Sequence, residues 1–174
     1  LHIDRVTSQL DLNATMLDAA GAPGLPSSMG RSLLPLIDDP ASGDWQDIVF
    51  SEYCTEPGDP AHSDGGRIWQ NRMVREGDWK LIYYHGMPSQ LFNLADDPGE
   101  INDLIEVPEH AGVAQRLTGM VLEDWDPEWV EAQIREQSAN LGVMFAWAEN
   151  TTPADTVRWD LKPEWDYLDD PQVP

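Results

Sequence analysis

Residues 71–84 read NRMVREGDWKLIYY and contain the pattern that decides the fold. Two short runs with apolar residues, Asn71–Arg75 and Trp79–Tyr84, flank Glu76-Gly77-Asp78. Glycine adopts the positive φ that a tight turn requires, so Gly77 predicts a β-hairpin. Alternation along Trp79–Tyr84 is imperfect, which indicates that both faces of this strand are covered.

Two further segments extend the hairpin into a sheet. Gln90–Leu94 follows after another turn, and three strands joined by short turns indicate an antiparallel meander. Asp47–Tyr53 carries β-branched and aromatic residues and is expected to join the same sheet. Apolar residues at helical spacing predict a helix over residues 108–123. The predicted fold class is therefore α+β, with a small antiparallel sheet packed against a helix, because an apolar sheet face must be covered.

A further helix is expected near the N-terminus. Val6–Ala20 has apolar residues on one face at helical spacing. Asp11 or Asn13 is expected to cap its start, because a short side-chain oxygen accepts a free backbone N–H there. Gly21 is expected to end it in a left-handed conformation.

The C-terminal part predicts one more helix and then a tail. Asp126 is the expected cap and Pro127 the first helical residue. The helix is expected to end near Asn140, because Gly142 interrupts the pattern. The last residues are rich in proline and are expected to be extended.

The composition is strongly acidic. The chain has 174 residues, of which 32 are acidic and 10 basic, so its net charge is −22. Such a field repels nucleic acid and anionic membranes, and no apolar run approaches the roughly twenty residues of a membrane span. We therefore expect no nucleic acid and no membrane as partners. The acidic surface is interpreted as a solvating one, with a polycation-binding surface as the alternative.

Patterns that indicate catalysis are scarce. The single cysteine, Cys54, precedes an acidic stretch, whereas a nucleophilic thiol needs an electropositive pocket. The four histidines show no ligand spacing. Paired aspartates adjoin proline or glycine, where turn and cap roles are expected. We therefore predict no catalytic residue and no metal ligand in this chain.

The segment Cys54–Trp69 is the strongest candidate for a binding role. It is a long loop between two predicted strands, and such loops often carry function. Three of its residues are predicted to bind substrate. Arg67 suits an anionic group, Trp69 a ring or a quaternary ammonium, and His62 a leaving-group oxygen. The alternative is an ordinary surface loop.

Two stretches resemble sulfatases of the alkaline-phosphatase superfamily. The first has an Asp-Leu before a helix that ends in Ala-Gly, followed by a Gly-x-Ser-Leu-x-Pro-Leu pattern. The second has the hairpin sequence, followed by two short segments, the predicted third strand and an Asp-Pro-Gly turn. The segments concerned are 6–21 (VTSQLDLNATMLDAAG), 29–36 (MGRSLLPL), 72–82 (RMVREGDWKLI), 90–94 (QLFNL) and 97–104 (DPGEINDL). Their order and spacing identify the chain as similar to arylsulfatases and choline-sulfatases over about residues 6–105.

The resemblance implies the C-terminal portion of a protein with an α/β fold. Residues 1–40 would end the larger α/β domain, 41–140 would form the sheet-plus-helix subdomain, and 141–174 an extended acidic tail. The family's nucleophile is a formylglycine made from the Cys of a Cys-x-Pro/Ala-x-Arg motif, which Cys54 does not match. Formylglycine and calcium are therefore expected in an N-terminal half outside this chain, and the chain alone is expected to be inactive.

The resemblance also implies partners and leaves alternatives. The expected partners are the N-terminal sulfatase domain and a sulfated small molecule or carbohydrate, and a homo-oligomer is compatible with the sequence. One alternative is a phosphonate or phosphate monoester hydrolase of the same superfamily. The other is a non-catalytic acidic interaction module. No compartment is indicated.

Overall fold

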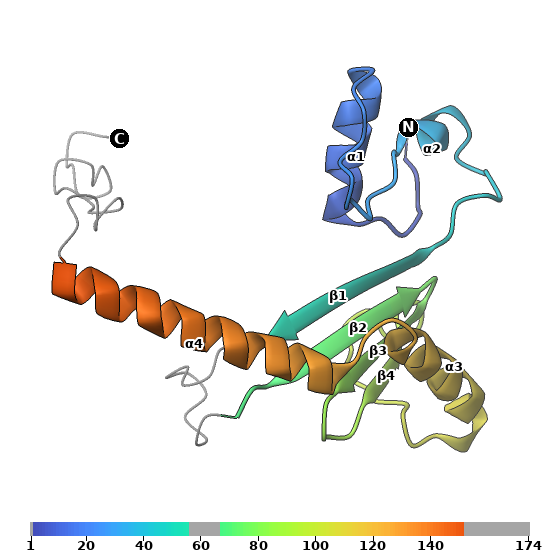
Figure 1. Ribbon diagram of the computed structural model, residues 1–174. Helices are drawn as coiled ribbons and strands as arrows, with labels where there is room; N and C mark the ends of the chain where they lie inside the picture. Colours follow the sequence, from blue (N-terminus) through green and yellow to red (C-terminus); the bar gives the residue numbers. More distant parts are fainter. Residues whose placement is uncertain (1, 56–66, 152–174) are drawn as a thin grey trace, which may run out of the picture. The chain divides into compact units, whose positions relative to one another are not determined.

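The computed structural model describes residues 2–55 and 67–151. The chain divides into two structural units, Leu1–Glu131 and Ala132–Pro174. The expected division after residues 40 and 140 stays a prediction. In chain order the elements are α1 (Gln9–Ala19), α2 (Leu34–Asp38), β1 (Ile48–Cys54), β2 (Gln70–Glu76), β3 (Trp79–Tyr84), β4 (Gln90–Asn93), η2 (Pro108–His110), α3 (Ala111–Leu122) and α4 (Pro127–Thr151) (Figure 1).

The strands form one antiparallel sheet in the order β1-β2-β3-β4. Trp79 pairs with Glu76, and Gly77, at φ +56°, makes the tight turn between them. Leu81 at the centre lies between Val74 and Leu91. The predicted meander is confirmed, and each strand boundary lies within one residue of its predicted position.

Helix α3 covers one face of this sheet (Figure 1). The buried cluster joins apolar side chains of the helix, the strands and the turn after the helix: Val74, Leu81, Leu91, Leu117, Val121 and Trp125. Tyr83 meets Trp125 edge to face, with ring centroids 5.9 Å apart. The predicted packing of a helix on the sheet is therefore confirmed.

Helix α1 has a different cap from the predicted one. Ser8 is the N-cap: its Oγ accepts from the Leu10 N–H at 3.2 Å. Asp11 accepts in return from the Ser8 N–H at 2.8 Å. The prediction of Asp11 or Asn13 as the cap is wrong, because the Ser8–Asp11 spacing satisfies two free N–H groups at once. Gly21, at φ +64°, follows the helix as predicted.

Helix α4 begins as predicted but ends later. Asp126 accepts from the backbone N–H groups of Glu128 and Trp129 at 3.0 and 3.2 Å. The helix runs through Gly142 to Thr151, because a single interior glycine costs only about 1 kcal/mol. The predicted end near Asn140 is therefore wrong, as is the extended conformation of residues 141–151. The rest of the predicted tail lies outside the described residues.

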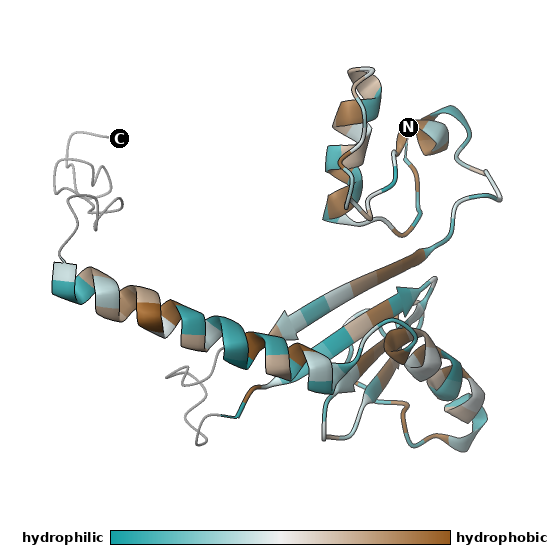
Figure 2. Cartoon of the chain, viewed as in Figure 1, coloured by the Kyte–Doolittle hydropathy of each residue, from teal (hydrophilic) through white to brown (hydrophobic). Residues whose placement is uncertain are grey.

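The side chains along α4 are mixed in character. Hydrophilic and hydrophobic positions recur over its whole length (Figure 2), and it has no buried residue in its described part. Within residues 2–55 and 67–151, no helix combines the length and the apolarity needed to cross a membrane.

Candidate functional site

Backbone contacts join the two ends of the loop that follows β1. The Thr55 N–H donates to the Trp69 carbonyl at 3.0 Å, and the Trp69 N–H donates to Thr55 Oγ1 at 2.8 Å. Thr55 is 3% exposed. These contacts continue the β1–β2 ladder beyond the Cys54–Gln70 pair. Residues 56–66 of the loop, and with them the predicted binding residue His62, lie outside the described residues.

The structure brings the other two predicted binding residues, Arg67 and Trp69, together. Arg67 Cζ lies 4.3 Å from the centroid of the Trp69 ring, and Arg67 is exposed. A Cβ on Gly86 would lie 3.5 Å from Arg67 Nη2, which places the guanidinium beside the β3–β4 turn. The ring quadrupole holds a cation without using its hydrogen bonds, so stacking on Trp69 does not itself occupy the N–H donors of Arg67.

Buried polar atoms without partners lie next to this loop end. Gln70 is 3% exposed, and its Oε1 and Nε2 have no hydrogen-bond partner in the described part of the chain. The His85 N–H donates to the Gln70 carbonyl at 3.0 Å, and His85 Nδ1 is likewise buried and unpaired. Each buried unmade hydrogen bond costs about 1–3 kcal/mol. Unpaired buried groups of this kind are rare in folded proteins.

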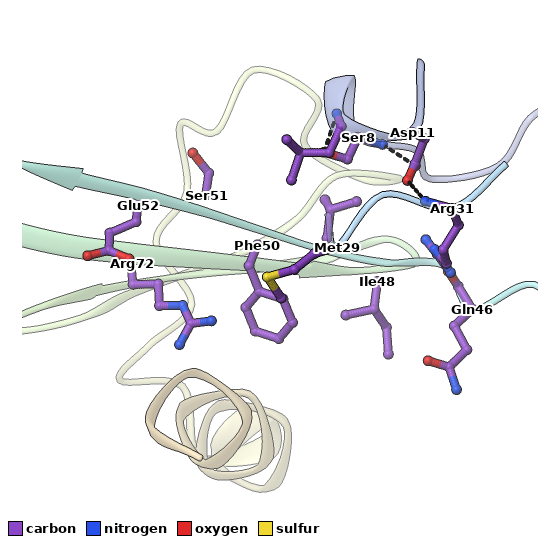
Figure 3. A pocket seen from close by; sticks show the side chains of 12 residues that line it. Ser8, Asp11, Met29, Arg31, Gln46, Ile48, Phe50, Ser51, Glu52 and Arg72 are labelled. Atoms are coloured by element: carbon purple, nitrogen blue, oxygen red, sulfur yellow. Dashed lines mark hydrogen bonds between the residues drawn. The ribbon is translucent and has the colours of Figure 1, made fainter. Parts of the chain in front are cut away.

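A concave surface of about 370 Å³ lies among α1, the Met29 loop and β1 (Figure 3). Its centre is apolar. Ile48 and Phe50 project from the same face of β1, and Met29 and Phe50 are 75% and 38% exposed. The guanidinium groups of Arg31 and Arg72 also line it. We refer to it as the Met29 pocket.

The Arg72 guanidinium at this pocket is already engaged. Its Nη1 donates to Asp124 Oδ1 at 2.6 Å and to the Val121 carbonyl at 3.0 Å, and its Cζ lies 4.7 Å from the Phe50 ring centroid. The hydrogen bond from Arg72 holds the pKa of Asp124 below its ordinary value. Arg72 therefore fastens β2 to the end of α3.

Asp11 at this pocket is engaged as well. It is 2% exposed, and its two oxygens accept from the N–H groups of Ser8 and Arg31, each at 2.8 Å. The Leu33 N–H donates to Thr15 Oγ1 at 2.9 Å. These bonds fasten α1 to the loop that follows it. Asp11 and Arg72 therefore make structural contacts at the Met29 pocket.

Comparison with known proteins identifies the family. The model of the family described as N-sulphoglucosamine sulphohydrolase, C-terminal, matches residues 1–125. The chain belongs to this sulfatase family. It is 31% identical over 163 residues to the choline-sulfatase of Rhizobium meliloti (strain 1021), covering 90% of the chain and 29% of that protein. It is 33% identical over 118 residues to arylsulfatase K of Gallus gallus, covering 62% of the chain and 20% of that protein.

Solved structures share the fold of this sulfatase chain. The phosphonate monoester hydrolase SpPMH from Silicibacter pomeroyi aligns with a TM-score of 0.57 and 29% identity, over 67% of the chain and 24% of that protein. The chain thus spans less than a third of the length of these relatives. The prediction of a sulfatase C-terminal portion with an α+β fold is confirmed.

The formylglycine and calcium of sulfatases do not fit the described residues of this sulfatase chain. Burial, together with the hydrogen bond and charge of Glu52, raises the pKa of the Cys54 thiol to about 11. Such a thiol is protonated at neutral pH and is a poor nucleophile. Within residues 2–55 and 67–151, no three His, Cys, Asp or Glu side chains are grouped to hold a metal ion.

Sequence reasoning missed the polar residues on the covered face of the sulfatase sheet. Gln70 and Arg72 share a face of β2 with Val74, which is completely buried. Alternation places every second residue on one face of a strand. Two long polar side chains that alternate onto the same strand face as a core valine are the signal that distinguishes these positions from ordinary surface residues. It was missed because Gln70 was placed outside the predicted strand.

Proposed function

We propose that this chain is the C-terminal part of an enzyme that hydrolyses sulfate esters and that its Cys54–Trp69 loop lines the substrate cleft. The observation that carries the proposal is the Arg67 guanidinium held over the Trp69 ring at the end of a loop with hydrogen-bonded ends. In a chain of the sulfatase family, a preoriented cation with free donors is suited to an anionic ester.

Each of the three loop residues would contact a different part of the substrate. Arg67 would bind an anionic group of a sulfated small molecule or carbohydrate through paired hydrogen bonds. Trp69 would support Arg67 with one ring face and leave its other face to a sugar ring or a quaternary ammonium. His62 would donate to the leaving-group oxygen. The unpaired Gln70 amide, next to Trp69 in the chain, supports the placement of a polar site here.

The rest of the enzyme would supply the chemistry. The family implies that a formylglycine would supply the nucleophile and that calcium would supply positive charge for the sulfate oxygens. The residues for both would lie in an N-terminal half, which is also the proposed partner of this chain. Apolar side chains support such a partner, because they remain exposed around α1: Leu10, Leu12, Met16 and Met29, at 54–75%.

The test uses the full-length protein and two substrates. Arg67→Ala and Trp69→Ala should lower kcat/KM about tenfold or more toward the physiological sulfate ester, since a lost charge-assisted hydrogen bond is worth about 1.5–3 kcal/mol. The effect on a small aryl sulfate should be smaller, because remote contacts serve substrate recognition. Arg116→Ala is the matched control, because Arg116 is also exposed but pairs with Glu76. Near wild-type kinetics of both loop variants on both substrates would refute the cleft assignment.

The chain by itself provides a second test. It should hydrolyse no aryl sulfate above the level of a boiled control. Turnover by the purified chain would refute the proposed division of labour between the two halves.

A phosphonate monoester hydrolase is the second candidate function, favoured by the 29% identity to the enzyme from Silicibacter pomeroyi. Competition between an aryl sulfate and an aryl phosphonate ester in the full-length protein separates the two activities. The non-catalytic alternative is separated by the upstream sequence, since a Cys-x-Pro/Ala-x-Arg motif there favours an enzyme.

A further inference from the structure

Three basic residues gather at a cavity of about 390 Å³ on the sheet. Val74 and Leu81 point into the core under α3, so alternation directs Met73, Arg75 and Lys80 to the opposite face. That face forms the cavity together with the N-terminal segment and residues near β4. Its lining residues of interest are Arg5, Met73, Arg75, Lys80 and Glu100. Three cations at one site are notable in a chain with 10 basic and 32 acidic residues.

Two of these cations already have carboxylate partners. Arg5 Nε donates to both oxygens of Asp47 at 3.0 and 2.9 Å, and its other nitrogens donate to backbone carbonyls. Lys80 Nζ donates to both oxygens of Glu100 at 2.8 and 2.7 Å. Four of the five N–H groups of Arg5 are therefore used in these contacts, and Lys80 contributes mainly its charge.

Arg75 is different. It is half-buried, lies directly across from Lys80 on the neighbouring strand, and donates from Nε to the Gly77 carbonyl at 2.9 Å. Its two terminal nitrogens have no hydrogen-bond or ion-pair partner among the described residues. Their planar pair of donors matches the spacing of two oxygens in a carboxylate, sulfate or phosphate.

We propose that this cavity is an oxyanion-binding site, with the Arg75 fork as the direct ligand and Lys80 as a neighbouring charge. Asp47 offsets the charge of Arg5 and Glu100 that of Lys80, so among the described residues the charge of Arg75 is the one in this lining that no carboxylate pairs with, although the whole chain carries −22. The Nε bond to Gly77 orients the fork before a ligand arrives, which lowers the entropy cost of binding. The oxyanion can be a free inorganic ion or a carboxylate from the remainder of the protein.

The test compares thermal unfolding in sodium sulfate and sodium chloride at matched ionic strength. Wild type is set beside Arg75→Gln, Arg75→Lys and the control Arg116→Gln, with circular dichroism as the check of folding. Sulfate stabilises proteins in general, so the difference between variants is the readout. For a free oxyanion, sulfate should raise the Tm of wild type and of the control more than that of either Arg75 variant. In calorimetric titration, sulfate affinity should fall about tenfold in both Arg75 variants, because lysine keeps the charge but lacks the fork.

The same variants in the full-length protein distinguish a free inorganic oxyanion from a carboxylate of the remaining sequence. If a carboxylate of the remaining sequence occupies the site, sulfate should give the full-length wild type no specific stabilisation. Arg75→Gln should then lower Tm more than Arg116→Gln does. The proposal is overturned if the Arg75 variants and the Arg116 control behave alike in both proteins, or if Arg75→Lys binds sulfate as well as wild type does.

Discussion

Replacement of Gly30 by alanine tests how the sulfatase-like segment 29–36 holds α1. A Cβ at Gly30 would overlap the Leu10 carbonyl oxygen, and it would lie 2.6 Å from the Leu10 carbonyl carbon and 3.2 Å from the Asp11 nitrogen. These are backbone atoms, so no rotamer change relieves the clash. The helix cannot simply move away, because Asp11 is hydrogen-bonded to the loop on the other side of Gly30.

The expected loss of stability follows from two opposing effects. Overpacking costs about 1–3 kcal/mol, and a rigid backbone neighbour places Gly30→Ala at the upper end. Against this, alanine restricts the unfolded chain and returns about 0.4–1 kcal/mol. The net loss should therefore be about 2 kcal/mol or more. Gly24→Ala, in the same loop, is the matched control, since a Cβ there meets no atom within 4 Å. It should be neutral or slightly stabilising.

Urea denaturation followed by circular dichroism measures the difference. The midpoint of Gly30→Ala should fall with an unchanged slope, which indicates a change in stability rather than in compactness. A free energy of unfolding for Gly30→Ala within about 0.5 kcal/mol of that for Gly24→Ala would refute the close approach of this loop to α1.

Two further predictions concern titratable groups. Burial tends to raise the pKa of Asp47, but hydrogen bonds from Arg5 and the Val6 N–H, with the Arg5 charge, lower it below the ordinary value of 3.8. Wild type should therefore be more stable than Asp47→Asn above pH 3.8. The difference in stability should shrink as pH falls through the lowered pKa of Asp47. A difference in urea midpoint that stays constant across this pH range would contradict the prediction. Glu52 raises the pKa of Cys54, so Glu52→Gln should speed alkylation of the thiol in mild alkali, and equal rates of iodoacetamide labelling would exclude the effect.

Local patterns predicted the sheet well because its determinants are local. A single glycine at the hairpin turn, short connections and alternating apolar residues specify both the strands and their order. The cap of α1 was harder. Asp11 reaches Ser8, three residues earlier, and also Arg31, twenty residues later. Only the folded structure shows that this second contact exists.

The candidate site also has features that the sequence predicted and features that it did not. Loop length and residue type were enough to select Arg67 and Trp69. Their stacking depends on the backbone conformation just before β2, and the sequence alone did not predict it. Among the described residues, the Gln70 side-chain amide and the terminal nitrogens of Arg75 have no partner; this is a tertiary property, since it depends on every neighbour that does not approach. The late end of α4 shows the opposite error, because a local signal at Gly142 was overestimated.

The distribution of ion pairs links the two proposed anion sites. Several cations of the described residues pair with carboxylates, among them Arg5, Arg72, Lys80 and Arg116. Arg67 and Arg75 have none among the described residues, although acidic residues outnumber basic ones 32 to 10. Arg67 stacks on Trp69 instead, and Arg75 donates from Nε to the Gly77 carbonyl. A net charge of −22 repels anions over a range of about 10 Å at 0.1 M salt and over longer distances at lower salt. Recognition of a sulfated or carboxylated group by this chain therefore has to come from short-range directional donors, and these two arginines retain such donors.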